Sequence, residues 1–307
     1  IGIDEFFGHS EPRLPEVKEK IDRWQLVEQI GAGGFGQVFK SVHVDTGQLS
    51  AIKLMSQTGP DKKKIPPNSS QFRFFRERFL DEAALSMKVS SPFVVSAHEA
   101  GKEPWPWIRY PLVDGQSIEE SMRHSDNPRA HWWEMAHDLI SGLSTIHQEG
   151  LLHKDVKTGN MLRAPDRFVL LDFGIGEVVG YSELSGFGGI GGTYGFMAPE
   201  LLMQSAGGRA PSFEIDVFSA GMTLLSVFDQ KPLQALQIAQ VSSQAGDHDT
   251  LASFLSEPLS LANAPQETRP LLAAMLNFDP GARPSASKLL AYVANYVDLE
   301  SKISLIQ

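Results

Sequence analysis

The 307 residues are 42% hydrophobic and 21% charged, which is enough apolar sequence for a sizeable core and excludes a disordered or fibrous chain. The formal net charge of −10 argues against a nucleic-acid partner, because nucleic-acid-binding domains carry a basic footprint. The absence of cysteine excludes disulfides, thiolate metal sites and cysteine nucleophiles, and it fits a reducing compartment such as the cytoplasm. This length favours two domains, or one domain with two lobes.

No stretch reaches the roughly 18 uncharged apolar residues that a membrane-spanning helix needs. The first residues, Ile1 to Glu16, mix acidic and apolar side chains and do not resemble a secretory signal. The chain begins with Ile rather than Met, so we expect a processed product or a piece of a longer protein, whose anchor, if any, would lie outside this sequence.

Strands are predicted over residues 24–55, where apolar and polar residues alternate on both sides of a glycine cluster. A tight turn is expected at Asp45-Thr46-Gly47, and residues 56–70 have the glycine, proline and lysine content of a loop.

A helical period follows from Gln71 to Ser90 and is closed by Pro92. Short strands are expected at 93–97 and 107–113. The apolar side of the predicted helix consists of Phe75, Phe79, Ala83, Leu85 and Met87.

After residue 117 the pattern is mostly helical. Amphipathic or buried helices are predicted at 131–148, 215–228, 268–278 and 285–298. Strands first and helices afterwards predict an α+β chain in two segregated halves.

The first chemical motif is a glycine-rich run between two predicted strands. Without a side chain, glycine lets backbone N–H groups come close to a phosphate. A dinucleotide-binding run would instead open a helix, and a P-loop would end in Gly-Lys-Ser/Thr. A glycine-rich hairpin without any ligand is the alternative. The run reads Gly31-Ala32-Gly33-Gly34-Phe35-Gly36-Gln37-Val38.

The second motif is Lys53, which stands inside the apolar strand Ala51-Ile52-Lys53. A buried lysine is costly unless it pairs with a carboxylate or an anionic ligand. Glu82 on the following helix is the candidate partner, whereas a lysine at a sheet edge with its ammonium in solvent is the alternative.

The third motif places two carboxylates, a carboxamide and an ammonium within a short stretch. Asp155 could orient and deprotonate a hydroxyl, and Asn160 and Asp172 offer the oxygen ligands that Mg²⁺ prefers. A solvated polar loop is the alternative, but apolar pairs beside both segments favour burial. The segments are Leu151-Leu152-His153-Lys154-Asp155-Val156-Lys157-Thr158-Gly159-Asn160 and Leu170-Leu171-Asp172-Phe173-Gly174.

Together with Ala198-Pro199-Glu200, these motifs occur in the order found in protein kinases, and the chain resembles a eukaryotic-type (Hanks-type) protein Ser/Thr kinase catalytic domain. The resemblance implies an α+β bilobal fold, with a small mainly β N-lobe and a larger mainly helical C-lobe. It places an N-terminal extension at 1–23, the kinase domain at 24–298 and a tail at 299–307. Within the domain it places the N-lobe at about 24–110, the hinge at 111–114 and the C-lobe at 115–298.

The resemblance also implies the catalytic roles. Asp155 would accept the proton of the substrate hydroxyl and Lys157 would steady the transferring phosphoryl group. Lys53 would contact the phosphates of ATP and pair with Glu82. Asn160 and Asp172 would hold Mg²⁺. The partners would be protein substrates that present Ser or Thr hydroxyls, with no nucleic acid.

The ATP site implied by the family comprises the glycine run, the gatekeeper and the hinge. Tyr110 resembles the gatekeeper; Pro111 offers only a carbonyl, and Val113 can donate its N–H. Ordinary core packing is the alternative for the apolar members. The implied set is Ile30, Gly31, Ala32, Gly33, Gly34, Phe35, Gly36, Val38, Ala51, Lys53, Tyr110, Pro111, Val113 and Leu162.

Further positions are similar to the Ser/Thr branch and to the family's structural residues. Lys157 and Thr193 resemble Ser/Thr rather than tyrosine kinases, and Thr193 would contact the catalytic loop from the substrate side. Asp216 would be a buried anchor at a helix start. His153 would be structural, and Glu200 would pair with Arg283 in the C-lobe.

Two departures from the family bear on regulation. Lys154 replaces the usual arginine before Asp155, and lysine lacks the bidentate fork that grips a phosphate. We therefore do not expect tight control by phosphorylation of the loop from Gly174 to Ala198. The stretch from Lys53 to Glu82 is also longer than is usual, with the extra residues in a lysine-containing loop.

The main alternative is a pseudokinase-like nucleotide-binding scaffold, which the presence of the catalytic residues disfavours. A small-molecule kinase is a further alternative, but such enzymes usually lack the Ala-Pro-Glu segment. The acidity is concentrated in one half: residues 1–110 carry 15 basic and 14 acidic side chains, and residues 111–307 carry 12 and 23. This asymmetry suggests steering of a basic substrate, although Ser117 and Gly159 stand where basic-directed relatives often have carboxylates.

Overall fold

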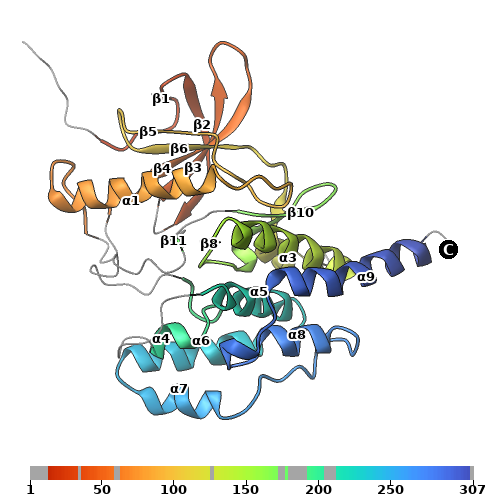
Figure 1. Ribbon diagram of the computed structural model, residues 1–307. Helices are drawn as coiled ribbons and strands as arrows, with labels where there is room; N and C mark the ends of the chain where they lie inside the picture. The colour runs from red at the N-terminus through yellow and green to blue at the C-terminus, as the bar shows by residue number, and fades with distance from the viewer. Residues whose placement is uncertain are drawn as a thin grey trace, which may run out of the picture. The chain divides into compact units, whose positions relative to one another are not determined.

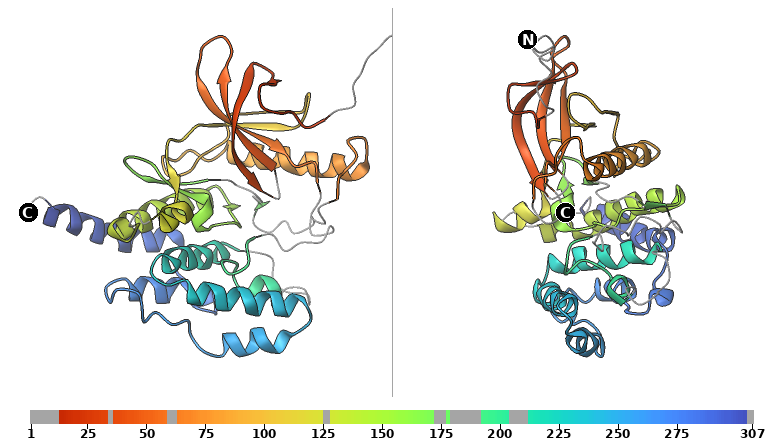
Figure 2. Two further views of the ribbon diagram at one scale, coloured as in Figure 1. Left: turned by 180° about the vertical axis from the view of Figure 1, so that it is seen from behind. Right: turned by 90° about the vertical axis from the view of Figure 1, so that its left-hand side faces the viewer.

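The structure is a computed structural model and describes residues 13–33, 36–58, 63–124, 128–171, 177–178, 192–203 and 212–304. The chain divides into two compact units, one of residues 1–87 and 97–112 and the other of 88–96 and 113–307. The first is built mainly of strands and the second mainly of helices, which confirms the predicted α+β fold class (Figures 1 and 2).

The first unit contains a six-stranded antiparallel sheet in the order β1-β2-β3-β4-β6-β5. The predicted strands of 24–55 form its centre, and the turn at Asp45-Thr46-Gly47 joins β3 to β4, where Gly47 adopts a positive φ of 72°. The strands are β1 (Lys20–Ile21), β2 (Trp24–Gly33), β3 (Gly36–His43), β4 (Leu49–Met55), β5 (Glu99–Gly101) and β6 (Trp107–Pro111).

Helix α1 (Ser70–Ser86) packs against β5 and β6 of this sheet. Ser69 begins the helix, because its hydroxyl accepts a hydrogen bond from the N–H of Phe72 at 3.0 Å. Phe72 in turn packs edge-on against the buried Trp105, with ring centroids 5.1 Å apart. The indole of Trp105 donates to the carbonyl of Met55 at 2.8 Å, which ties the loop before β6 to the end of β4.

Two predictions about this region are wrong in detail. The helix ends at Ser86, before the predicted Ser90, and Met87 is 43% exposed rather than on the apolar side. The hydroxyl of Ser86 instead accepts the N–H of Ala97 at 2.9 Å, which turns the chain back. Residues 93–97 form no strand, because they pair with the single residue Leu170 instead of a whole neighbouring strand.

The second unit is organised around α3 (Trp132–Gln148), whose buried stripe includes the predicted Leu139, Ile140 and Leu143. Helix α9 (Ala286–Ser304) lies beside α3 (Figures 1 and 2), and α5 (Glu214–Ser226) also packs on it. The rings of Trp133 on α3 and Tyr296 on α9 stack with centroids 4.0 Å apart.

Helix α9 runs six residues beyond the predicted end, and three helices of this unit, besides the one-turn α4 (Glu200–Met203), were not predicted individually. They are α2 (Ile118–Arg123), α6 (Lys231–Gln244) and α7 (His248–Leu255). The remaining elements are α4 (Glu200–Met203), α8 (Arg269–Met275), a sheet of β7 (Gln116–Ser117), β9 (Met161–Arg163) and β10 (Phe168–Leu170), the pair β8 (Leu151–Leu152) and β11 (Glu177–Val178), and the 3₁₀ turns Pro128–His131, Thr158–Asn160 and Pro280–Ala282. Within the described part of the chain, no helix has the length and apolar character that crossing a bilayer requires.

We predict that Gly36→Ala destabilises the first unit, because a Cβ at Gly36 would lie 2.1 Å from the carbonyl oxygen of Leu54. Relief of this clash requires β3 to move away from β4, at a cost of about 1–3 kcal/mol in the free energy of unfolding. Chemical denaturation followed by circular dichroism measures this cost.

Gly33→Ala is the matched control, because Gly33 is the partner of Gly36 on the opposite strand of the hairpin. A Cβ there meets no atom within 4 Å, so we expect a change of about 0.5–1 kcal/mol or less. Equal destabilisation by both variants would contradict the close-approach explanation for Gly36.

Candidate active site

In the first unit, the ammonium of Lys53 and the carboxylate of Glu82 form the predicted ion pair. Lys53 lies on β4 and Glu82 on α1, their Nζ and Oε1 atoms are 2.8 Å apart, and both residues are buried, at 3% and 6% exposure. Desolvation offsets much of the attraction in such a pair, so its main consequence is positional. The pair holds the lysine ammonium at one place beside β4.

The glycine-rich run forms the predicted hairpin between two strands. Gly31 pairs with Val38 across the hairpin, and Gly33 pairs with Gly36 where β2 ends and β3 begins. Its tip, Gly34 and Phe35, lies outside the described residues. The run therefore opens no helix, which excludes the dinucleotide-binding arrangement.

The apolar residues expected around a base differ in exposure. Ile30 is 47% exposed at the surface of β2, whereas Ala51 and Tyr110 are buried on neighbouring strands and are paired in register. Ala32 is exposed, Val38 and Pro111 are half-buried, and Val113 and Leu162 are half-buried residues of the second unit.

In the second unit, three side chains converge on the carboxylate of Asp155. The hydroxyl of Thr193 donates to Oδ1 at 2.7 Å, the ammonium of Lys157 contacts Oδ2 at 2.7 Å, and the amide of Asn160 donates to Oδ2 at 2.9 Å. Lys157 also donates to the Thr193 hydroxyl at 2.7 Å. The structure thus brings together the predicted catalytic-loop residues and Thr193, and it holds the carboxylate in one orientation.

The remaining predicted metal ligand, Asp172, lies outside the described residues. The residue before it, Leu171, is bonded to the segment from His153 to Asn160 at two points: its N–H donates to the carbonyl of Asn160 at 2.7 Å and its carbonyl contacts Nε2 of His153 at 2.9 Å. His153 is completely buried and contacts this backbone, as a structural residue would.

Asp216, at the start of α5, holds the segment that leads into Asp155. Its carboxylate accepts the N–H groups of His153 and Lys154, each at 2.8 Å, and Nε2 of His147 lies 3.0 Å from Oδ2. Lys154 adopts a positive φ of 68°, an uncommon conformation that this contact helps to hold. The predicted anchoring role of Asp216 is confirmed.

Burial alone would raise the pKa of Asp216, but the hydrogen bond and charge interactions of His147 and the contacts of His153 outweigh it, so the pKa is lowered. His147 is a partner that sequence reasoning missed. It is an exposed-looking polar residue near the end of an amphipathic helix, and no local pattern connects it to Asp216.

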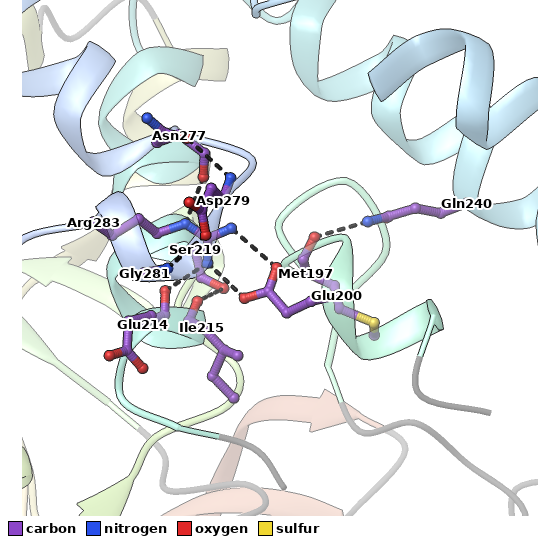
Figure 3. A network of polar contacts seen from close by, with 10 residues as sticks. All are labelled: Met197, Glu200, Glu214, Ile215, Ser219, Gln240, Asn277, Asp279, Gly281 and Arg283. Atoms are coloured by element: carbon purple, nitrogen blue, oxygen red, sulfur yellow. Dashed lines mark hydrogen bonds and ion pairs between the residues drawn. The ribbon is translucent and has the colours of Figure 1, made fainter. Parts of the chain in front are cut away.

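Glu200, the first residue of α4, forms the predicted ion pair with Arg283 (Figure 3). The two Nη atoms of Arg283 contact the two carboxylate oxygens of Glu200 at 2.6 and 3.0 Å. Arg283 also donates to the carbonyls of Asn277 and Glu214, which joins three segments through one guanidinium. Such a planar fork is the group best suited to bidentate carboxylate binding.

The residues from Gly195 to Met197 are attached to α6 through Gln240, which the sequence analysis did not single out. Its carboxamide bridges two backbone groups of that segment. Only the tertiary structure shows this, because a lone glutamine on a helix gives no local signal.

The chain belongs to the protein kinase domain family, whose family model matches residues 24–293. Among curated proteins it is 28% identical, over 92% of the chain, to a probable serine/threonine-protein kinase, PkwA, of Thermomonospora curvata. It is 29% identical, over 73% of the chain, to the serine/threonine-protein kinase PknJ of Mycobacterium tuberculosis, and 28% identical, over 93%, to mitogen-activated protein kinase kinase kinase 3 of Arabidopsis thaliana. These alignments cover 35%, 37% and 43% of the relatives' own lengths, so the chain spans less than half of each.

We predict that Asp216→Asn lowers the free energy of unfolding at pH 7 by roughly 3 kcal/mol, because an amide cannot accept three hydrogen bonds from buried groups as a carboxylate does. The pKa of Asp216 is lowered in the fold, so its stabilisation is present above the unfolded pKa of about 3.9 and is lost as the pH falls through the folded pKa. The difference between variant and wild type should narrow below about pH 4, as measured by denaturation at several pH values.

Asp249→Asn, an exposed carboxylate of α7, is the control and should change stability by less than about 0.5 kcal/mol. A pH-independent difference between Asp216→Asn and wild type would contradict the assignment of a charged anchor.

Proposed function

We propose that residues 24–298 form an ATP- and Mg²⁺-dependent protein serine/threonine kinase domain. The observation that carries this proposal is the carboxylate of Asp155, held by Lys157, Asn160 and Thr193 within 2.9 Å. The family and the names of the relatives support the same activity.

Asp155 would accept the proton of a substrate hydroxyl while Lys157 supplies positive charge beside the reacting oxygen. In the present arrangement Lys157 neutralises the carboxylate and also bonds Thr193, so a hydroxyl entering this site would share these contacts. Catalysis of phosphoryl transfer depends mainly on positioning and electrostatics. The side chains of Asp155, Lys157 and Thr193 would position the substrate hydroxyl and supply the charges around it.

The donor set fits a nucleotide and a hard cation. The amide nitrogen of Asn160 donates to the side chain and to the carbonyl of Asp155, and its carboxamide oxygen would be a Mg²⁺ ligand together with Asp172. Lys53 would bind phosphate oxygens, and Glu82 fixes its position. When bound, Mg²⁺ and ATP would supply charge neutralisation and the transferable phosphoryl group.

The nucleotide's base would contact the apolar residues that the family resemblance implies. The implied contacts are Ile30, Val38, Ala51, Tyr110, Pro111, Val113 and Leu162, with the glycine run from Gly31 to Gly36 over the phosphates. The high exposure of Ile30 supports this assignment, since a large apolar side chain at 47% exposure gains from a covering ligand. A cytoplasmic location would supply ATP and fits the cysteine-free composition.

We predict that Asp155→Asn lowers the rate of phosphate transfer to protein at least about 100-fold, because the amide cannot accept the hydroxyl proton. Transfer of labelled phosphate from ATP to a generic protein substrate measures the effect. ATP binding should persist, since Asp155 is not among the nucleotide-binding residues.

Asp166→Asn is the matched control, because its side chain is 70% exposed and is paired with the neighbouring Arg167. Transfer by Asp155→Asn at the wild-type rate would refute the proposed base. ATP binding without any transfer by the wild type would instead favour a pseudokinase scaffold.

We predict that the products are phosphoserine and phosphothreonine, and that peptides with Arg or Lys near the acceptor react faster at low ionic strength. The excess of acidic side chains after residue 110 attracts a basic substrate over a distance, and salt screens this attraction. A peptide library assayed at two salt concentrations tests both points. Phosphotyrosine alone would refute the Ser/Thr assignment, and the absence of a basic preference would refute the steering.

A further inference from the structure

Gln240 lies in the middle of α6, yet its carboxamide is fully buried and makes no bond to its own helix. Its Oε1 accepts the N–H of Gly195 at 2.7 Å. Its Nε2 donates to the carbonyl of Met197 at 2.7 Å, as Figure 3 shows. Both polar ends of one side chain are therefore used by a single segment elsewhere in the sequence.

The segment from Thr193 to Met197, here called the acceptor-side segment, has few other ways to satisfy these groups. The carbonyl of Thr193 already accepts two N–H groups, those of Phe196 and Met197, each at 3.1 Å. Gly195 and Met197 are buried, so solvent does not replace Gln240. Loss of the carboxamide would leave two buried backbone groups without their present partners, which is the costly case for hydrogen bonds.

The acceptor-side segment also packs closely against α6 at Gly195. Gly195 has a positive φ of 89°, and a Cβ there would lie 3.0 Å from the carbonyl oxygen of Leu233 and 3.1 Å from its side chain. The backbone at Gly195 thus approaches the helix as closely as a residue without a side chain permits. Gln240 and Gly195 together determine how the segment lies on α6.

The other end of this segment lies at the proposed catalytic base. Thr193 contacts both Asp155 and Lys157 through its hydroxyl, at 2.7 Å each. A peptide whose hydroxyl reaches Asp155 must therefore pass beside the residues that follow Thr193. Those residues are the ones that Gln240 holds.

We propose that Gln240 is a positioning residue for protein substrates: by fixing the backbone of Gly195 and Met197, it sets the surface that contacts the substrate residue beside the acceptor. This inference rests on the proposed kinase activity and adds a residue from α6 to it. Gln240 acts on peptide binding rather than on ATP, because both hydrogen bonds of its carboxamide go to the acceptor-side segment.

The test uses Gln240→Met, which keeps the length of the side chain and removes both hydrogen bonds. We expect the KM for a peptide substrate to rise at least about tenfold while the KM for ATP stays within twofold, with steady-state transfer kinetics on the whole chain as the measurement. Gln244→Met is the matched control, because Gln244 is exposed on the same helix, and it should leave both constants unchanged. A generally damaged fold would alter both constants of Gln240→Met, so an equal rise in the two KM values overturns the proposal.

Gly195→Ala provides a second route, because its Cβ would displace the segment from Leu233 while Gln240 remains intact. It should raise the KM for peptide in the same direction, and it decides the matter if Gln240→Met does not fold. An unchanged peptide KM in a folded Gly195→Ala or Gln240→Met variant would overturn the inference. Wild-type protein that transfers no phosphate would instead overturn the proposed function, so the two failures are distinguishable.

Discussion

The proposed catalytic loop depends on one buried carboxylate. Asp216 is completely buried at the start of α5 and accepts the consecutive N–H groups of His153 and Lys154, while His147 on α3 contacts the same oxygen as His153. Burial opposes the charge, and the donors around it more than compensate, as the lowered pKa of Asp216 indicates. Because His153 and Lys154 directly precede Asp155, the position of this proposed base follows from hydrogen bonds to a residue of α5.

Buried polar side chains also hold the segments that follow Thr193 in the sequence. Loop backbone cannot satisfy its polar groups through a regular ladder, so buried loops need side chains from rigid elements. Arg283 joins Glu200 to the carbonyls of Asn277 and Glu214, and Gln240 serves the backbone at Gly195 and Met197. Glu200 and Glu214 lie 83 and 69 residues from Arg283, and Gly195 and Met197 lie 45 and 43 residues from Gln240, so most of these partners come from distant parts of the sequence.

Much of the candidate site could be predicted because its chemistry is local in sequence. The order of the glycine run, Lys53 and the loop around Asp155 pointed to phosphoryl transfer, and Glu82 followed as the carboxylate on the next helix. The errors lie where long-range contacts decide. Residues 93–97 have strand-like composition but pair only with Leu170, and α1 stops at Ser86 because that hydroxyl bonds Ala97.

The sequence by itself determined the α+β class, the strands of 24–55, the helix of 131–148 and the residue types that a kinase domain needs, because hydrophobic period and motif spacing are properties of contiguous residues. Only the tertiary structure decided that Thr193 and Lys157 share the carboxylate of Asp155, that His147 supports Asp216, and that Gln240 holds Gly195 and Met197. Apart from the contact between Lys157 and Asp155, which are two residues apart, each of these contacts joins residues at least 36 positions apart in the sequence. A buried polar group requires a partner, but the fold alone selects which residue supplies it.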